Sequence, residues 1–86
     1  MIQYEITFSK SAIKELESLN NKLIDRIWVK IEQLQKNPRP LGCLKLQGSN
    51  KLWRIRIGNY RILYSISEAE SIIDIISIKN RKDIYK

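Results

Sequence analysis

The chain has 86 residues, 43% of them hydrophobic and 29% charged, which suits one folded domain with a single core rather than a disordered chain. Its net charge is +7, and residues 41–67 carry five basic side chains and no acidic one, a distribution typical of polyanion binders. The alternative is a solvated basic face that only maintains solubility. The absence of histidine and the single cysteine exclude a Cys/His zinc site, a catalytic imidazole and an internal disulfide.

No segment predicts export or membrane insertion. The first residues alternate in polarity and lack the continuous apolar run of a signal peptide. No stretch approaches the roughly 20 apolar residues that a membrane-spanning helix needs. We therefore expect a cytoplasmic protein with no membrane partner.

The first half of the chain predicts a strand and two helices. Residues 2–8 alternate apolar and polar side chains, as in a strand with one buried face. Ser9 or Ser11 can cap a following helix, whose apolar positions are Ala12, Ile13, Leu16 and Leu19. Asn20-Asn21 ends it, and a second helix is expected over residues 22–36. Its apolar stripe comprises Ile24, Ile27, Ile31 and Leu34, widened by Leu23 and Trp28.

The second half predicts a sheet. Pro38 and Pro40 end the second helix, and residues 41–50 form either a loop or a short strand. Strands are expected over 51–57, 60–67 and 72–78, the last covered on both faces because it is almost wholly apolar. Together these elements predict an α+β fold. A two-helix hairpin packs on one face of a small antiparallel sheet, in the order β-α-α-β-β-β.

Gly58-Asn59 is expected to form a two-residue type II′ turn that fixes the register of a hairpin. In that register Ile57 faces Tyr60 and Arg56 faces Arg61. Alternation then places on one core-facing side the residues Trp53, Ile55, Ile57, Tyr60, Ile62 and Tyr64. The other side carries Arg54, Arg56 and Arg61.

Two arginines directly opposite each other repel, so a fold gains no stability from placing Arg56 opposite Arg61. A bound phosphate would supply the missing anion, and the planar guanidinium suits its oxygens. The alternative is that both side chains splay into water, where screening weakens the repulsion. We favour the phosphate interpretation.

Several segments match one known family in their order and spacing. The most specific is Trp53 to Tyr64, which spans the hairpin. The others are the first strand with Phe8, the helix around residues 12–16, the loop 45–48 and the segment 81–85. On these residues, the chain resembles the RelE/ParE toxin superfamily over nearly its whole length.

The resemblance implies a toxin of a type II toxin–antitoxin system, with a cognate antitoxin as partner and operator DNA bound only through the antitoxin complex. RelE-like members act with the ribosome and messenger RNA, which they cut in the A site. The ribose 2′-hydroxyl attacks the adjacent phosphate, and neither a metal nor a cofactor is expected. Such chemistry requires positioning, charge stabilisation and proton transfer.

Site residues follow from the same resemblance. Arg56, Arg61, Arg81 and Tyr85 match catalytic positions, with Arg61 and Arg81 stabilising the transition state. Tyr85 would stack on a base or help to move a proton. RNA binding falls to Lys45, Lys51 and Arg54.

The chain departs from the best-known RelE pattern at two places. Arg54 and Arg56 stand where that pattern has lysines, and Asn80 stands where some relatives have histidine. Arginine effectively cannot lose its proton, so Arg54 and Arg56 are expected to act as electrostatic clamps rather than bases. Two other functions therefore stay open. One is a ParE-like inhibitor of DNA gyrase without nuclease activity, and the other is an inactive relative that binds only its antitoxin and operator DNA.

Overall fold

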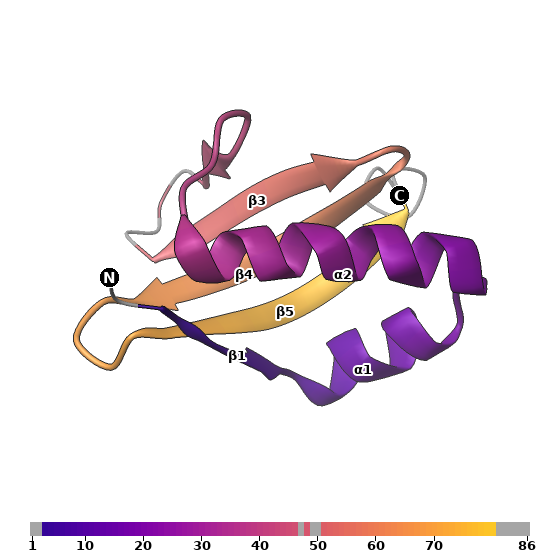
Figure 1. Ribbon diagram of the computed structural model, residues 1–86, viewed down its shortest axis with the longest axis horizontal. Coiled ribbons are helices and arrows are strands. Elements are labelled where there is room, and N and C mark those ends of the chain that lie inside the picture. The colour runs from indigo at the N-terminus through magenta and orange to yellow at the C-terminus, as the bar shows by residue number, and fades with distance from the viewer. Residues whose placement is uncertain (1–2, 47, 49–50, 81–86) are drawn as a thin grey trace.

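Two helices and five strands make up the part of the chain that the structure, a computed structural model, describes: residues 3–46, 48 and 51–80 (Figure 1). Their order is β1 (Glu5–Phe8), α1 (Lys10–Glu17), α2 (Asn21–Lys36), β2 (Leu44–Lys45), β3 (Leu52–Ile57), β4 (Tyr60–Ser67) and β5 (Ile72–Asn80). The predicted elements are confirmed to within a few residues, and the stretch 41–50 contributes the short strand β2. Neither helix is long and apolar enough to cross a membrane.

The strands form one sheet in the order β1-β5-β4-β3-β2. The α+β class, with two helices on a sheet, is confirmed, but the sheet is mixed rather than wholly antiparallel because β1 runs parallel to β5. A parallel pair needs a long connection between its strands. Here both helices and three strands lie between β1 and β5. The alternation of apolar and polar residues predicts each strand, but it does not show whether the strand runs parallel or antiparallel to its neighbours.

Side-chain caps decide where both helices begin. The Ser9 hydroxyl oxygen accepts a hydrogen bond from the Ala12 N–H at 3.0 Å, which confirms Ser9 as a cap. The Asn20 side-chain oxygen accepts from the Leu23 N–H at 2.9 Å. The Asn pair therefore starts α2 as well as separating it from α1. Each cap satisfies an amide that has no partner within its helix.

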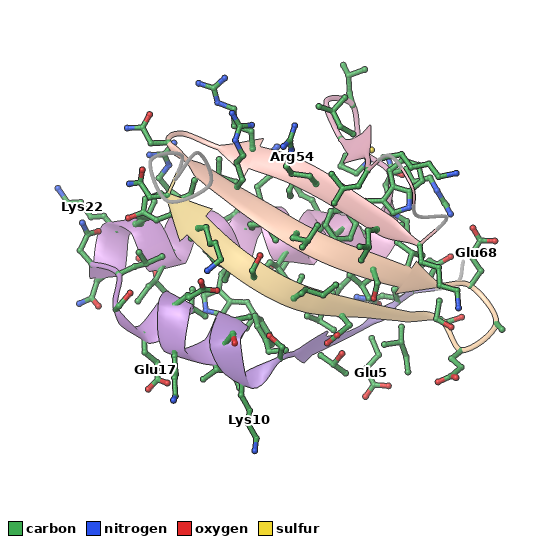
Figure 2. All side chains as sticks on the ribbon, turned by 180° about the vertical axis from the view of Figure 1, so that it is seen from behind. Glu5, Lys10, Glu17, Lys22, Arg54 and Glu68 are labelled. Atoms are coloured by element: carbon green, nitrogen blue, oxygen red, sulfur yellow. The ribbon has the colours of Figure 1, made fainter. Side chains whose placement is uncertain are left out.

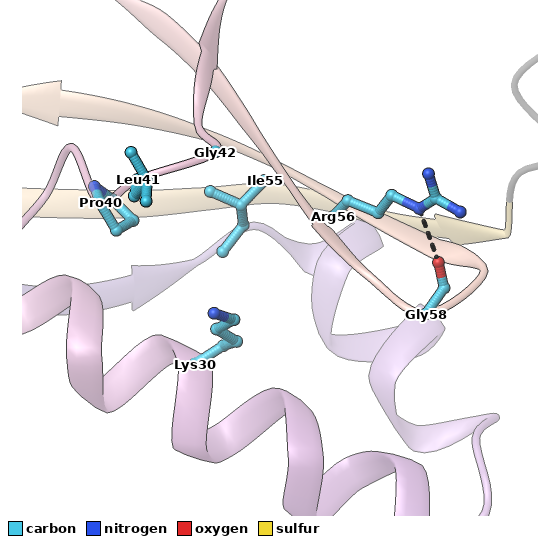
Figure 3. Close-up of a pocket in the computed structure, with 7 residues that line it drawn as sticks. All are labelled: Lys30, Pro40, Leu41, Gly42, Ile55, Arg56 and Gly58. Carbon is cyan, nitrogen blue, oxygen red and sulfur yellow. Dashed lines mark hydrogen bonds between the residues drawn. The ribbon is translucent and has the colours of Figure 1, made fainter.

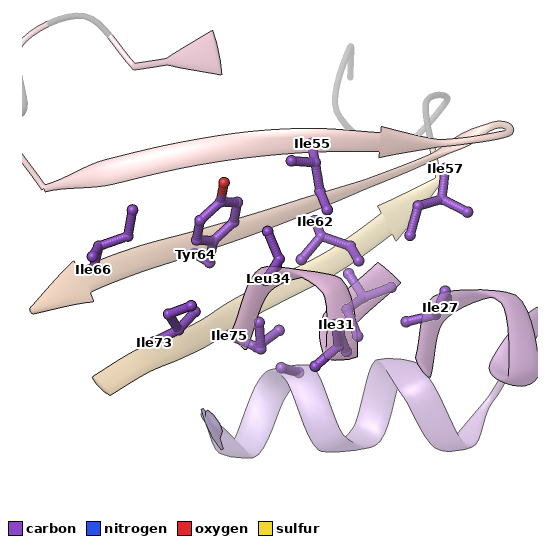
Figure 4. Close-up of a cluster of buried hydrophobic side chains, with 12 residues drawn as sticks. Ile27, Ile31, Leu34, Ile55, Ile57, Ile62, Tyr64, Ile66, Ile73 and Ile75 are labelled. Atoms are coloured by element: carbon purple, nitrogen blue, oxygen red, sulfur yellow. The ribbon is translucent and has the colours of Figure 1, made fainter. Parts of the chain in front are cut away.

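The core lies between the helices and one face of the sheet, because both helices pack on the same side (Figures 1 and 4). Its buried members are Ala12, Ile27, Ile31, Leu34, Ile55, Ile57, Ile62, Tyr64, Ile66, Ile73, Ile75 and Ile78. In β5, buried residues alternate with partly exposed ones over most of the strand. The prediction that this strand is covered on both faces is therefore wrong for the residues described. Its apolar run reflects a central position in the sheet, between β1 and β4.

Two of the predicted apolar helix positions are exposed. Ile13 is 45% exposed, since the helical period turns Ala12 and Leu16 toward the sheet and leaves Ile13 at the side. Trp28 is 40% exposed and packs its ring edge to face with Phe8, with ring centroids 5.5 Å apart. Trp28 thus packs against an apolar side chain, as predicted, but at the rim of the core.

Tyr64 joins the sheet to the segment after α2. Its ring is fully buried on β4, and its hydroxyl donates a hydrogen bond to the Pro38 carbonyl oxygen at 2.7 Å. Burial raises the pKa of this hydroxyl, so it stays protonated and able to donate. The chain is therefore fixed at the point where α2 gives way to the loop.

We expect Tyr64→Phe to lower the free energy of unfolding by about 1 kcal/mol, because the Pro38 carbonyl loses its donor while the ring packing is kept. Urea unfolding followed by circular dichroism measures the change. Tyr60→Phe is the matched control, since Tyr60 is only partly buried and its hydroxyl makes no hydrogen bond within the described residues. Equal losses in the two variants would show that the Tyr64 hydrogen bond contributes no stability.

Candidate nucleic-acid interface

The hairpin of β3 and β4 has the register that the two-residue turn predicts. Ile57 pairs with Tyr60, Arg56 with Arg61 and Trp53 with Tyr64. Gly58 has a φ of +57° and Asn59 has a negative φ, as a type II′ turn requires. Since side chains alternate along a strand, this register sends the isoleucines and Tyr64 into the core and the arginines to the opposite side.

Arg54, Arg56 and Arg61 therefore lie on the face of the sheet that points away from the helices, which we call the open face. Figure 2 views the molecule from this side and labels Arg54. Arg56 is exposed, and its Nε donates a hydrogen bond to the Gly58 carbonyl oxygen at 3.0 Å (Figure 3). Arg61 is partly buried, and its Nε is fully buried with no acceptor among the described residues. A buried donor without a partner costs roughly 1–3 kcal/mol, so this nitrogen of Arg61 adds no stability to the fold.

No carboxylate neutralises these arginines within residues 3–46, 48 and 51–80. The two ion pairs of that part of the chain are Arg39 with Glu68 and Lys79 with Glu15. Arg39 also stacks over the Trp53 ring, 5.1 Å from its centroid, which holds it apart from the other arginines. Among the described residues, the positive charge at the turn end of the hairpin thus has no compensating carboxylate on the open face.

The other predicted site residues that the structure describes do not lie beside these three arginines. Lys45 pairs with Trp53, so it belongs to the opposite face of the sheet from Arg54. Lys51 precedes β3, about 17 Å from Arg56 at the usual rise along a strand. Arg81 and Tyr85 lie outside the described residues. The structure therefore brings together Arg54, Arg56 and Arg61.

Comparisons with known proteins agree with the fold and the sequence motifs. A family model described as the ParE toxin of the type II toxin–antitoxin system parDE matches residues 6–85. The chain belongs to the RelE/ParE toxin superfamily. Toxin RelE3 of Methanocaldococcus jannaschii is 32% identical over 85 residues, which cover 94% of each protein.

Solved RelE structures share the architecture of this toxin. RelE in an archaeal RelE–RelB complex from Pyrococcus horikoshii has a TM-score of 0.83 and 30% identity, covering 92% of this chain and 96% of that one. The isolated E. coli RelE toxin has a TM-score of 0.81 and 23% identity, covering 95% and 90%. At that identity the E. coli structure supports the fold alone.

Lys79 is a basic residue near the site that the sequence did not predict. It lies across from Arg61 on β5, which extends the row of cations over three strands. A β-bulge near Tyr64 shifts the pairing of β4 with β5, so simple alternation cannot place Lys79. Its ammonium binds the Glu15 carboxylate at 2.6 Å, which distinguishes it from the three arginines of the open face.

Glu15, on α1, covers an edge of the sheet. β1 ends at Phe8, opposite Ile75, and leaves the outer edge of β5 without a strand beyond that point. There Glu15 Oε1 accepts a hydrogen bond from the Ile78 N–H at 3.0 Å. The Ser9 hydroxyl donates to the Ile76 carbonyl at 2.7 Å on the same edge. These two side chains thus replace the missing backbone partners and hold the end of β5 against α1.

We expect Glu15→Ala to lower the free energy of unfolding by about 1–2 kcal/mol, because it leaves the buried Ile78 N–H without an acceptor. Glu15→Gln keeps an acceptor and loses only a partly exposed ion pair, so its loss should be about 0–1 kcal/mol. Chemical denaturation measures both variants, with Glu17→Ala on the exposed side of α1 as the control. If Gln destabilises the toxin as much as Ala, the ion pair rather than the hydrogen bond fixes this edge.

Proposed function

We propose that this toxin is a ribosome-dependent endoribonuclease that cuts messenger RNA in the ribosomal A site. The observation that carries the proposal is the Arg56–Arg61 pair on the open face, with no carboxylate partner among the described residues. Two facing guanidinium groups destabilise a free sheet but fit the oxygens of a phosphate in the RNA backbone. The named relatives are RelE toxins, which favours this branch of the superfamily.

In the proposed reaction, the 2′-hydroxyl oxygen attacks the adjacent phosphorus and the bond from phosphorus to the 5′-oxygen breaks. A cyclic phosphate and a 5′-hydroxyl result. Arg61 and Arg81 stabilise the charge that builds on the phosphoryl oxygens, and Arg56 clamps the same group. Because arginine keeps its proton, proton transfer is assigned to Tyr85 or to ribosomal groups.

The RNA strand is proposed to run along β3. Arg54 is two residues before Arg56 on the open face, so it meets a neighbouring phosphate. Lys51, at the start of the same strand, contacts RNA farther along. Lys45 contacts the RNA only where the RNA passes over the β2 edge of the sheet.

The proposed partner is a cognate antitoxin that holds the toxin inactive, with operator DNA bound through their complex. Support comes from the Pyrococcus horikoshii RelE, which was crystallised with RelB. We expect a small gene beside this one to encode the antitoxin. Expression of the toxin should arrest growth, and co-expression of that gene product should restore it.

We expect Arg61→Ala to reduce cleavage of messenger RNA on stalled ribosomes by about 100-fold or more, the usual effect of removing a group that stabilises transition-state charge. Primer extension in a translation extract measures the cuts, and circular dichroism verifies the fold. Lys10→Ala, which changes an exposed cation at the start of α1, is the control and should cut normally. The proposal fails if the Arg61 variant cleaves at the parent rate. DNA breaks that depend on gyrase, without RNA cleavage, would instead assign the toxin to the ParE-like branch.

We expect Arg54→Gln to weaken binding of single-stranded RNA to a similar extent for all sequences, because the contact is to phosphate. The slope of log K against log salt should fall in magnitude by about 0.7, the value for one phosphate contact on a single strand. Fluorescence anisotropy across a salt series measures both quantities. An unchanged slope would show that Arg54 makes no phosphate contact.

A further inference from the structure

Three cations lie in a row across the sheet, one on each of three neighbouring strands. Arg56 on β3 faces Arg61 on β4, and Arg61 in turn faces Lys79 on β5. Neighbouring strands lie about 4.8 Å apart, so the row spans roughly 10 Å from its first residue to its last. We call Arg56, Arg61 and Lys79 the cation row.

The side chain of Lys79 starts on one face of the sheet and ends at the other. Ile78 is buried in the core, so alternation along β5 directs the exposed Lys79 side chain to the open face. Its ammonium nevertheless binds the carboxylate of Glu15 on α1, a helix of the covered face (Figure 1). The side chain therefore passes around the outer edge of β5, where β1 has already ended at Phe8.

Glu15 makes two contacts that do not depend on each other. Its Oε2 binds the Lys79 ammonium at 2.6 Å, and its Oε1 accepts the hydrogen bond from the Ile78 N–H. The side chain of Lys79 is 47% exposed and that of Glu15 is 22% exposed, so water reaches the ion pair. A partly exposed ion pair contributes little, so another anion can replace this carboxylate at the ammonium. The backbone contact survives such an exchange.

We propose that Lys79 is a further RNA-binding residue, which exchanges the Glu15 carboxylate for an RNA phosphate. This inference rests on the proposed function, in which Arg56 and Arg61 hold the scissile phosphate. Arg54 meets the neighbouring phosphate on one side, along β3, and Lys79 meets the neighbouring phosphate on the other side, across β4. The RNA therefore turns at the Arg56–Arg61 pair, from β3 towards β5. The flexible four-carbon stem of lysine lets its charge move between the two anions.

Glu15 holds Lys79 until RNA is bound. In the free toxin, an unneutralised third cation beside Arg61 would add to the repulsion within the cation row. The Glu15 carboxylate removes that cost, since it takes the place of the phosphate at the end of the row. When RNA binds, the ammonium moves to the open face, and the hydrogen bond from the Ile78 N–H keeps the end of β5 in position.

The first test measures binding of a single-stranded RNA oligonucleotide to the toxin by fluorescence anisotropy across a salt series. Lys79→Gln should weaken binding and lower the slope of log K against log salt by about 0.7, the value for one phosphate contact. Lys79→Arg keeps the charge and should keep the slope. On stalled ribosomes, Lys79→Gln should raise KM for cleavage by roughly threefold or more and leave kcat within about twofold, because the phosphate it binds does not react.

Glu15→Gln tests the exchange, because it removes the competing charge and keeps an acceptor for the Ile78 N–H. It should tighten RNA binding by roughly two- to fivefold, the factor that a partly exposed ion pair is worth. Glu17→Gln removes an equal charge from an exposed position of the same helix and is the matched control. The gain from Glu15→Gln should exceed the gain from this control. In a Lys79→Gln background, it should fall to the control's value.

An unchanged salt slope in Lys79→Gln, or equal gains in Glu15→Gln and Glu17→Gln, overturns the inference, and Lys79 then only stabilises the end of β5. If the parent toxin binds RNA only on the ribosome, an unchanged KM in Lys79→Gln overturns it. None of these results touches the proposed function, which the Arg61→Ala cleavage assay decides. A parent toxin that neither binds nor cuts RNA overturns both.

Discussion

The two-residue turn at Gly58-Asn59 is the constraint on which the rest of the structure depends. It fixes which residues of β3 and β4 face each other, and with that it fixes which side of the sheet each side chain occupies. A register change of one residue would move the isoleucines to solvent and the arginines into the core. The apolar core and the arginine cluster are therefore two results of one local backbone conformation, and neither can change without the other.

The arginines of the open face lower the stability of the free protein. Arg56 and Arg61 repel each other, and the Arg61 Nε is buried without an acceptor among the described residues. Ile55, Ile57 and Ile62 on the other side of the same strands supply the burial that offsets these costs.

Local chemistry in the sequence predicted the parts of the fold that local interactions determine. The Ser9 cap, the type II′ turn and the pairing of Arg56 with Arg61 all follow from residues close together in the chain. Features that depend on contacts between residues far apart in the sequence were not predicted. The parallel pairing of β1, the hydrogen bond of Glu15 at the β5 edge and the ion pair of Lys79 with Glu15 each join segments more than 60 residues apart. Lys45 also shows that a basic residue near a site in sequence can belong to the other face.

The pairing of β1 with β5 joins the two ends of the described chain, Glu5 with Ile72 and Phe8 with Ile75. β5, which lies between β1 and β4 in the sheet, is thus the last of the described strands to be synthesised. Contacts of such long range form late in folding, because the intervening chain must be brought together first. During translation, the nascent polypeptide lacks the strand that anchors both β1 and β4. A toxin with this topology completes its sheet only after β5 has been translated.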